Sequence, residues 1–253
     1  GHYGGRVPTP KVHGILHPQR GRLQSGGPLR SQRDLLRWIL DTDAQAFVLK
    51  PIAGWNSQGV AIFSEVLRDG DQVELVTPGG RILSLDEAIE MSQFTSRGNA
   101  GTILQDYVVP HPWFSQEGLA GANVFRILTV RSPQATYVVA AVLFCGRADS
   151  DVNSWQRGAI SIHIDVASGV LGKGRTLPRF GTMDLRTHPD TGHQFTGKCP
   201  PAWDDTVAVA HHAADMLPEV PVVCWEVLLS EDGPLLLEGN IGFGLTMLQV
   251  HGP

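Results

Sequence analysis

The chain has 253 residues, of which 42% are hydrophobic and 18% are charged, and its formal net charge is −5. This composition is typical of a folded protein rather than a disordered one, and the negative charge argues against a general nucleic-acid surface, which needs a basic excess. The length fits either one large domain or two small lobes around a cleft, and composition does not choose between them.

The first elements predict a helix followed by a hairpin. Residues 21–32 read as a flexible loop, and the apolar spacing of residues 33–41 predicts a short helix. Residues 46–53 predict a strand that enters the glycine-containing turn 54–59, and residues 60–63 predict the returning strand.

A second helix and a further strand follow. Ser84 and Glu87 have the spacing of a capping box, which predicts a helix that ends near Gly98. Residues 102–109 predict the next strand. The first part of the chain is thus expected to form a compact unit of strand, hairpin, helix and strand.

The rest of the chain is rich in strands, which predicts a second sheet. The strand-like segments are residues 123–130, 135–144, 158–166, 220–230 and 234–240. Residues 203–217 have helical apolar spacing and predict one helix packed on this sheet. The order of elements is not the βαβ order of a Rossmann domain, and neither GxGxxG nor GxxxxGK[ST] occurs. Two α+β lobes are therefore predicted.

Two acidic residues stand on neighbouring strands near the end of the chain. Glu226 and Glu238 flank the tight turn at residues 231–233, which places their strands side by side. Glu238 and Asn240 are two residues apart, so they project from the same face of an extended strand. Two carboxylates and an amide oxygen suit magnesium. The alternative is a solvated hairpin face, which spacing alone leaves open.

Lys50 ends an apolar strand just before a proline and a glycine-containing turn. Its ammonium group suits phosphate oxygens, and backbone N–H groups in the turn 54–59 can cradle anions. The alternative is a lysine at a strand end whose side chain reaches water beside a structural hairpin.

Five segments, taken in order, resemble the successive motifs of the ATP-grasp superfamily, and most closely its sugar-transfer-associated group. They are FVLKPIAGWNSQGV (47–60), ILQDYV (103–108), NVFRILTV (123–130), NSWQRGAISIHIDVASG (153–169) and WEVLLSEDGPLLLEGN (225–240). The resemblance covers residues 7–249, and its specificity lies in order and spacing. It implies an α+β ATP-grasp fold with mostly antiparallel sheets, in which a small lobe (1–108) and a large lobe (109–253) grip ATP.

The resemblance assigns nucleotide binding to eight residues of the small lobe, namely Lys50, Gly54, Ser57, Gly59, Gln105, Asp106, Tyr107 and Val108. The lysine would contact the phosphates, and the glycine-containing loop would close over them. Gln105 would face the adenine amino group in the hinge, and the backbone of Tyr107 and Val108 would complete the adenine edge.

The resemblance also assigns roles to residues of the large lobe. Arg126 would face the transferred phosphoryl group or the acyl phosphate, and Asn153 and Arg157 would lie in a loop near the phosphates. The implied magnesium ligands are Glu226, Glu238 and Asn240. The implied cofactors are ATP and Mg²⁺.

The sequence departs from the family pattern in three places. Glu226 stands where Asp is more common, although Glu also offers oxygen, and the phosphate loop holds Trp55 and Gln58 where smaller residues or a lysine are frequent. The family usually has an N-terminal domain and a further nucleotide-contacting lysine, for which Lys11 is the candidate here. We therefore expect a short-form enzyme, a homodimer, or a partner domain that completes the acceptor site.

The histidines and cysteines predict no other chemistry. His211 and His212 are adjacent on a predicted helix and point to different faces, whereas His163 and Asp165 alternate on one strand face and can reach a cleft. No partner has zincin-like spacing, which favours a structural role for these histidines. The three cysteines are widely spaced and include no CxxC pair, which argues against disulfides and thiolate zinc sites.

The longest apolar runs, such as residues 135–144, are too short to span a bilayer, and no signal-peptide pattern opens the chain. The sequence therefore predicts a cytoplasmic protein without membrane or nucleic-acid partners.

The main expectation is an ATP-dependent ligase that joins a small-molecule or peptide carboxylate to an amine through an acyl phosphate. A kinase acting on a sugar or other hydroxyl is the alternative, and it would need a general base such as Asp165 or Asp151. The third possibility is a non-catalytic nucleotide-binding module. Residues 96–101 and 173–201 are expected to be lids, substrate-binding elements or solvent-exposed connectors.

Overall fold

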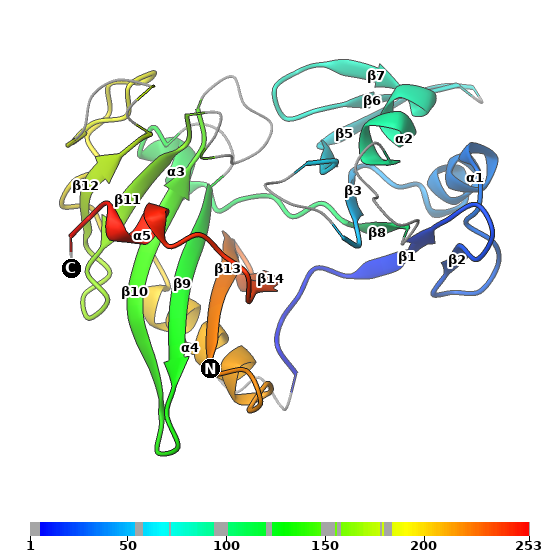
Figure 1. The fold of residues 1–253 in the computed structure, drawn as a ribbon. Helices are drawn as coiled ribbons and strands as arrows, with labels where there is room; N and C mark the ends of the chain where they lie inside the picture. Colours follow the sequence, from blue (N-terminus) through cyan, green and yellow to red (C-terminus); the bar gives the residue numbers. More distant parts are fainter. Residues whose placement is uncertain are drawn as a thin grey trace. The chain divides into compact units, whose positions relative to one another are not determined.

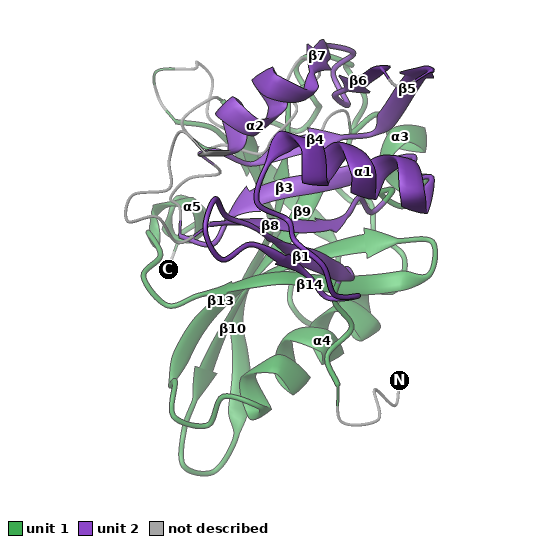
Figure 2. Ribbon diagram, turned by 90° about the vertical axis from the view of Figure 1, so that its right-hand side faces the viewer, with its two compact units in different colours: residues 1–9, 109–253 green, residues 10–108 purple. Residues whose placement is uncertain are grey.

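The computed structural model of the chain describes residues 6–53, 58–70, 72–93, 101–119, 123–147, 155, 158–177, 179 and 184–252. Contacts divide the chain into two compact units (Figure 2), one of residues 10–108 and one of residues 1–9 with 109–253. All described strand pairs in both units are antiparallel. The predicted α+β architecture with antiparallel sheets is therefore confirmed.

The unit of residues 10–108 is built on a five-stranded sheet with the order β2-β1-β8-β3-β4. Its strands are β1 (Val12–Leu16), β2 (Arg22–Leu23), β3 (Phe47–Pro51), β4 (Ala61–Phe63) and β8 (Thr102–Asp106). The helices α1 (Gln32–Thr42) and α2 (Leu85–Gln93) cover one face, where Phe47, Leu49 and Leu104 are fully buried. The Ser31 hydroxyl caps α1 by accepting from the Asp34 amide.

A three-stranded sheet belongs to the same unit, with the order β5-β6-β7. Its strands are β5 (Glu65–Asp69), β6 (Gln72–Val76) and β7 (Ile82–Ser84). Ser84 and Glu87 form the predicted capping box, since the Ser84 amide donates to the Glu87 carboxylate and the Glu87 amide donates to the Ser84 hydroxyl.

One expectation for this unit needs correction. The segment expected to be a loop contains β2, which forms because Leu23 pairs with Gly14 of β1. Helix α2 is described from Leu85 to Gln93, and the end predicted near Gly98 lies outside the described residues. The pattern of apolar residues in the sequence did not predict β1, β5, β6 and β7, which are short and partly exposed.

The other unit contains a six-stranded sheet with the order β12-β11-β10-β9-β13-β14. Its strands are β9 (Asn123–Arg131), β10 (Thr136–Cys145), β11 (Ile160–Ile164), β12 (Leu171–Arg175), β13 (Val222–Ser230) and β14 (Gly233–Asn240). Every strand predicted for this sheet is confirmed. β12 was not predicted, because Gly172, Lys173 and Gly174 give it little strand character.

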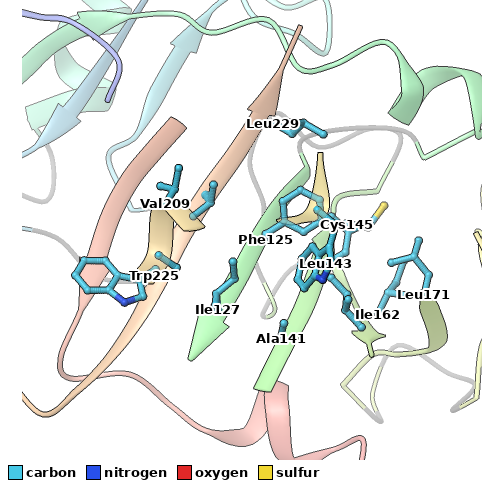
Figure 3. Close-up of a cluster of buried hydrophobic side chains, with 14 of the residues drawn as sticks. Phe125, Ile127, Ala141, Leu143, Cys145, Ile162, Leu171, Val209, Trp225 and Leu229 are labelled. Atoms are coloured by element: carbon cyan, nitrogen blue, oxygen red, sulfur yellow. The ribbon is translucent and has the colours of Figure 1, made fainter. Parts of the chain in front are cut away.

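The two faces of this sheet are covered differently (Figure 1). Helix α4 (Trp203–Asp215) packs on one face, as predicted, over a buried cluster that includes Phe125, Ile127 and Trp225 (Figure 3). The short helix α5 (Thr246–Gln249) lies on the opposite face, where Leu248 packs on Leu128. A third short helix, α3 (Trp113–Gln116), precedes β9. No helix among the described residues has the length and apolar character needed to cross a membrane.

Candidate active site

The strand order of the six-stranded sheet brings together four of the predicted site residues. Arg126 of β9 lies opposite Glu226 of β13, and Glu226 lies opposite Glu238 of β14. Opposed residues in an antiparallel ladder point to the same face, and this is the face opposite α4. The Arg126 Nη1 atom is 2.5 Å from the Glu226 Oε1 atom. The three charges therefore form one row across three strands.

Asn240 joins the two carboxylates. Its Nδ2 atom donates to Glu226 Oε1 at 3.1 Å and to Glu238 Oε1 at 3.0 Å. The prediction that Glu238 and Asn240 share a face with Glu226 is therefore confirmed. The described residues contain no group of three or more His, Cys, Asp or Glu side chains that could hold a metal, so this set offers two carboxylates and one amide.

Burial controls the charge of Glu226. Its side chain is 14% exposed, and burial raises the pKa of its carboxyl group to about 8, while the Arg126 guanidinium acts in the opposite direction and Glu238 adds to the rise. Burial thus makes the charged form of Glu226 costly, and positive charge beside it favours that form. Arg126 supplies one such charge, and the row favours a further cation.

Two residues near Arg126 and Glu226, namely Phe144 and Cys224, were not identified as site residues from the sequence. The guanidinium carbon of Arg126 lies 5.4 Å from the centroid of the Phe144 ring, in a cation–π arrangement. Cys224 is fully buried beside the row, and burial raises the pKa of its thiol to about 11. A thiol so rarely ionised is a packing residue rather than a nucleophile. No local sequence pattern points to either residue, because strand pairing alone places them here.

Lys50 and Gln105 share a face of the five-stranded sheet. Val48 lies opposite Gln105, and Lys50 lies opposite Ile103, so these four side chains point away from the face that α1 and α2 cover. Lys50 is partly exposed. The structure thus places a cation and an amide on the face opposite α1 and α2.

The orientation of the Gln105 amide is fixed by its neighbour. Its Nε2 atom donates to the Pro10 carbonyl oxygen at 3.2 Å, and a carbonyl oxygen only accepts. The Oε1 atom therefore points elsewhere as an acceptor, and it makes no hydrogen bond with a described residue. Gln105 is consequently presented as an acceptor.

Asp106 has a structural partner. His13 lies at a bulge in β1, where Val12 and Gly14 pair with consecutive residues of β8. The bulge lets the His13 Nε2 atom lie 2.5 Å from Asp106 Oδ1, and the imidazole ring lies tilted against the Trp38 ring, with 5.0 Å between the ring centroids. The Asp106 carboxylate therefore holds β1 to β8, and Tyr107 and Val108 follow directly after β8.

Of the remaining predicted residues, the structure describes only Gly59. Gly59 has a φ of 74°, a left-handed conformation that favours glycine, and it lies in the turn before β4. Gly54, Ser57, Asn153 and Arg157 lie outside the described residues.

The expected strand position of Asp165 was wrong, because β11 ends at Ile164. Asp165 instead begins the β11–β12 turn, where its Oδ1 atom accepts from the Ser168 hydroxyl at 2.6 Å and from the Ser168 amide at 2.8 Å. These hydrogen bonds lower the pKa of Asp165. A carboxylate used in this way is a poor general base.

His251 is hydrogen-bonded to Ser161 of β11, on the face of the sheet that also carries Arg126. The Ser161 hydroxyl donates to the Met247 carbonyl oxygen at 2.7 Å, so it must accept from His251 Nε2 at 2.9 Å. Burial, followed by the charges of His163 and Arg175, lowers the pKa of His251 to about 4. The neutral imidazole is thus part of the fold.

The lowered pKa of His251 predicts that the stability of the folded protein depends on pH. An unfolded histidine binds a proton below about pH 6.5 and the folded one only below about pH 4, so stability is lost as the pH falls through this window. His251→Gln keeps a donor for Ser161 and should flatten the fall of the thermal midpoint between about pH 7 and about pH 4.5. His211→Gln on α4 is the control. Equal slopes in all three proteins would contradict the role of His251.

The fold is that of the ATP-grasp superfamily. Residues 5–253 match the sequence profile of the family described as "Sugar-transfer associated ATP-grasp". The chain therefore belongs to this family, as the motifs predicted.

Solved structures give weaker similarities. The ADP complex of an N5-carboxyaminoimidazole ribonucleotide synthetase has 15% identity and a TM-score of 0.48, with 94% of this chain and 41% of that chain covered. Biotin carboxylase from Campylobacter jejuni has 12% identity and a TM-score of 0.49, with 95% and 38% covered. D-alanyl-alanine synthetase A from Vibrio cholerae has 9% identity and a TM-score of 0.47, with 97% and 56% covered.

The family assignment rests on the sequence profile, since each of these TM-scores is below 0.5. The chain spans between 38% and 56% of the length of these three proteins. A comparison with curated protein sequences found no match.

Proposed function

We propose that the protein is a Mg-ATP-dependent ligase that joins a carboxylate to an amine and releases ADP and phosphate. The observation that carries this proposal is the row of Arg126, Glu226 and Glu238, tied together by Asn240 on the face opposite α4. In an ATP-grasp protein, the carboxylates of such a row can hold a cation beside the transferred phosphoryl group, and the fixed guanidinium can contact that group directly.

The residues of the row fit a magnesium ion. Two carboxylates that share one hydrogen-bond donor repel each other, and a cation or a proton between them relieves the repulsion. Glu226 and Glu238 would hold the ion together with the Asn240 side-chain oxygen, once the Asn240 amide has turned its oxygen in place of its nitrogen towards the carboxylates. Magnesium prefers such hard oxygen ligands. Bound magnesium supplies neutralisation of phosphate charge.

Arg126 would act on the phosphoryl group directly. Its ion pair with Glu226 and its contact with Phe144 fix the guanidinium before any substrate arrives, and its Nε atom is buried without a hydrogen-bond partner among the described residues. A preorganised cation stabilises charge that develops in the transition state at little reorganisation cost. The substrate carboxylate would attack the γ-phosphorus and expel ADP, and an amine would then expel phosphate from the acyl phosphate.

The position of Asp165 favours this reaction over the kinase alternative. A hydroxyl acceptor needs a general base, whereas a carboxylate is already ionised. Asp165 is held in the β11–β12 turn by Ser168, which lowers its pKa. The other candidate base, Asp151, lies outside the described residues.

The first test is binding of the nucleotide. Mg-ATP at about 100 times its Kd should stabilise the folded protein by about 2.7 kcal/mol, which corresponds to a rise of about 5–10 °C in the thermal midpoint. EDTA should remove most of this rise, and Lys50→Ala should reduce it. No shift and no heat of binding at millimolar ATP would contradict the proposed function.

Gln105 should select adenine over guanine. Its Oε1 atom can accept from the 6-amino group of adenine but would face the 6-oxo group of guanine, an acceptor. Gln105→Leu should therefore weaken ATP binding about tenfold and change GTP binding less. Gln45→Leu is a matched control, because the Gln45 amide also donates to a backbone carbonyl of the same unit. An unchanged ATP-to-GTP ratio in Gln105→Leu would show that this amide does not read the base.

A further inference from the structure

A second charged surface lies at the edge of the six-stranded sheet. Gly174 of β12 and Leu185 exchange two backbone hydrogen bonds, with N···O distances of 2.8 and 2.9 Å. Residues on either side of such a pair point to one common face. Lys173, Arg175, Asp184 and Arg186 therefore share a face, and we call these four residues the β12 basic patch.

The β12 basic patch has more cations than its carboxylate can neutralise. Asp184 Oδ1 lies 2.6 Å from Arg175 Nη2, and Asp184 Oδ2 lies 3.3 Å from Lys173 Nζ. Arg186 is exposed and has no ion pair among the described residues. Three cations thus face one carboxylate, in a chain whose net charge is −5.

The neighbouring sequence does not restore the balance. Residues 176–183 add Arg179 and no acidic residue. The patch is accessible as well, since the side chain of Lys173 is 46% exposed and that of Arg175 is 23% exposed. An anion can therefore reach these cations from solvent.

The patch lies on the same face of the sheet as Arg126. Arg175 is opposite Ser161, Ser161 is opposite Phe144, and the Phe144 ring lies against the Arg126 guanidinium. Three strand spacings separate β12 from β9, which amount to roughly 14 Å. One ligand that reaches both places must be extended, and it must pass beside Met247 and His251, which lie over Ser161 between them.

We propose that the β12 basic patch binds an anionic group, a carboxylate or a phosphate ester, at the far end of an extended acceptor. This proposal rests on the proposed function, because Arg126 marks the reacting end. Arginine pairs with either anion in a two-pronged geometry, and the surplus charge gives Arg175 and Arg186 the capacity to do so. Asp184 keeps Lys173 and Arg175 in place until the anion arrives.

The test measures binding of two simple probes, succinate and inorganic phosphate, by NMR. The full chain is first saturated with magnesium and a non-hydrolysable ATP analogue, so that the nucleotide site is closed to the probes. The imidazole signals of His163 and His251 report binding, because His163 packs on Gly172 of β12 and the His251 ring lies 5.7 Å from that of His163.

We expect at least one probe to cause a saturable shift in the wild-type protein. Arg186→Gln should weaken that binding about fivefold, and Lys173→Gln combined with Arg186→Gln should abolish it. Arg131→Gln, which removes a partly buried arginine paired with Asp215 in the same unit, should have no effect. Saturation by succinate alone identifies a carboxylate, and saturation by phosphate alone identifies a phosphate ester.

The proposal is overturned if neither probe saturates, or if the affinity is the same in the double variant. It is also overturned if Arg186→Gln weakens binding of the ATP analogue, because the patch would then contact the nucleotide. Failure of the wild-type protein to bind the analogue, with probe binding intact, would contradict the ATP-dependent function and leave the anion site standing.

Discussion

Glu238→Gln is expected to lower ADP formation on the order of a hundredfold or more while leaving the thermal midpoint nearly unchanged. The side chain is exposed, so its contribution to folding is small. The amide of the variant can still accept from Asn240 Nδ2 through its oxygen, so the hairpin geometry survives. Only the negative charge is lost, and that charge is what a magnesium ion requires.

The matched control is Glu231→Gln in the turn between β13 and β14. It makes the same chemical change on the same hairpin at another exposed position, and it should leave ADP formation unchanged. Activity would be followed as ADP release from Mg-ATP in the presence of a pool of carboxylic acids. Wild-type turnover in Glu238→Gln would mean that these residues are a solvated hairpin face.

Glu226 is a less suitable position for this test. Its removal leaves the Arg126 guanidinium buried without its counter-charge, which destabilises the fold as well as the site. Low activity in a Glu226 variant would therefore not separate metal binding from stability. Glu238 separates them because it is exposed.

The acidic hairpin was predictable from sequence because its information is local. Glu226, Glu238 and Asn240 lie within one short stretch, and the turn between their strands fixes the register. The long strands β9, β10 and β13 were predictable for a related reason, since each is a run of β-branched and other apolar residues.

The partner of Glu226 was not predictable in this way. Arg126 meets Glu226 because β9 pairs with β13, two strands that lie far apart in the sequence. Phe144 joins them from β10, the strand on the other side of β9. Residue patterns do not encode strand order, so the family resemblance indicated a role for Arg126 without its contacts.

The basic patch was missed for a different reason. β12 has two glycines and two cations in five residues, which is a poor strand pattern. It forms because β11 on one side and Leu185 on the other satisfy its backbone. Because Lys173 and Arg175 are two residues apart in this strand, their side chains point to the same face.

Arg126→Ala is expected to abolish both signals that distinguish a ligase from a kinase. A ligase that activates a carboxylate forms an acyl phosphate, and hydroxylamine, a small nucleophile, converts this intermediate into a hydroxamate. A phosphorylated alcohol does not react with hydroxylamine. Wild-type protein with Mg-ATP, a carboxylic acid and hydroxylamine should therefore release ADP and form hydroxamate in equal amounts.

The variant should lose both products together, on the order of a hundredfold or more, at a temperature below its own thermal midpoint, where the protein is still folded although Glu226 has lost its partner. The reason is that Arg126 would stabilise the phosphoryl group in the step that precedes either product. Arg131→Ala on the same strand is the control, since its guanidinium pairs with Asp215 away from the row, and it should retain both. Candidate acids and sugars would be supplied as pools. ADP release coupled to a stable phosphomonoester, without hydroxamate from any acid that stimulates turnover, would overturn the ligase proposal in favour of a kinase.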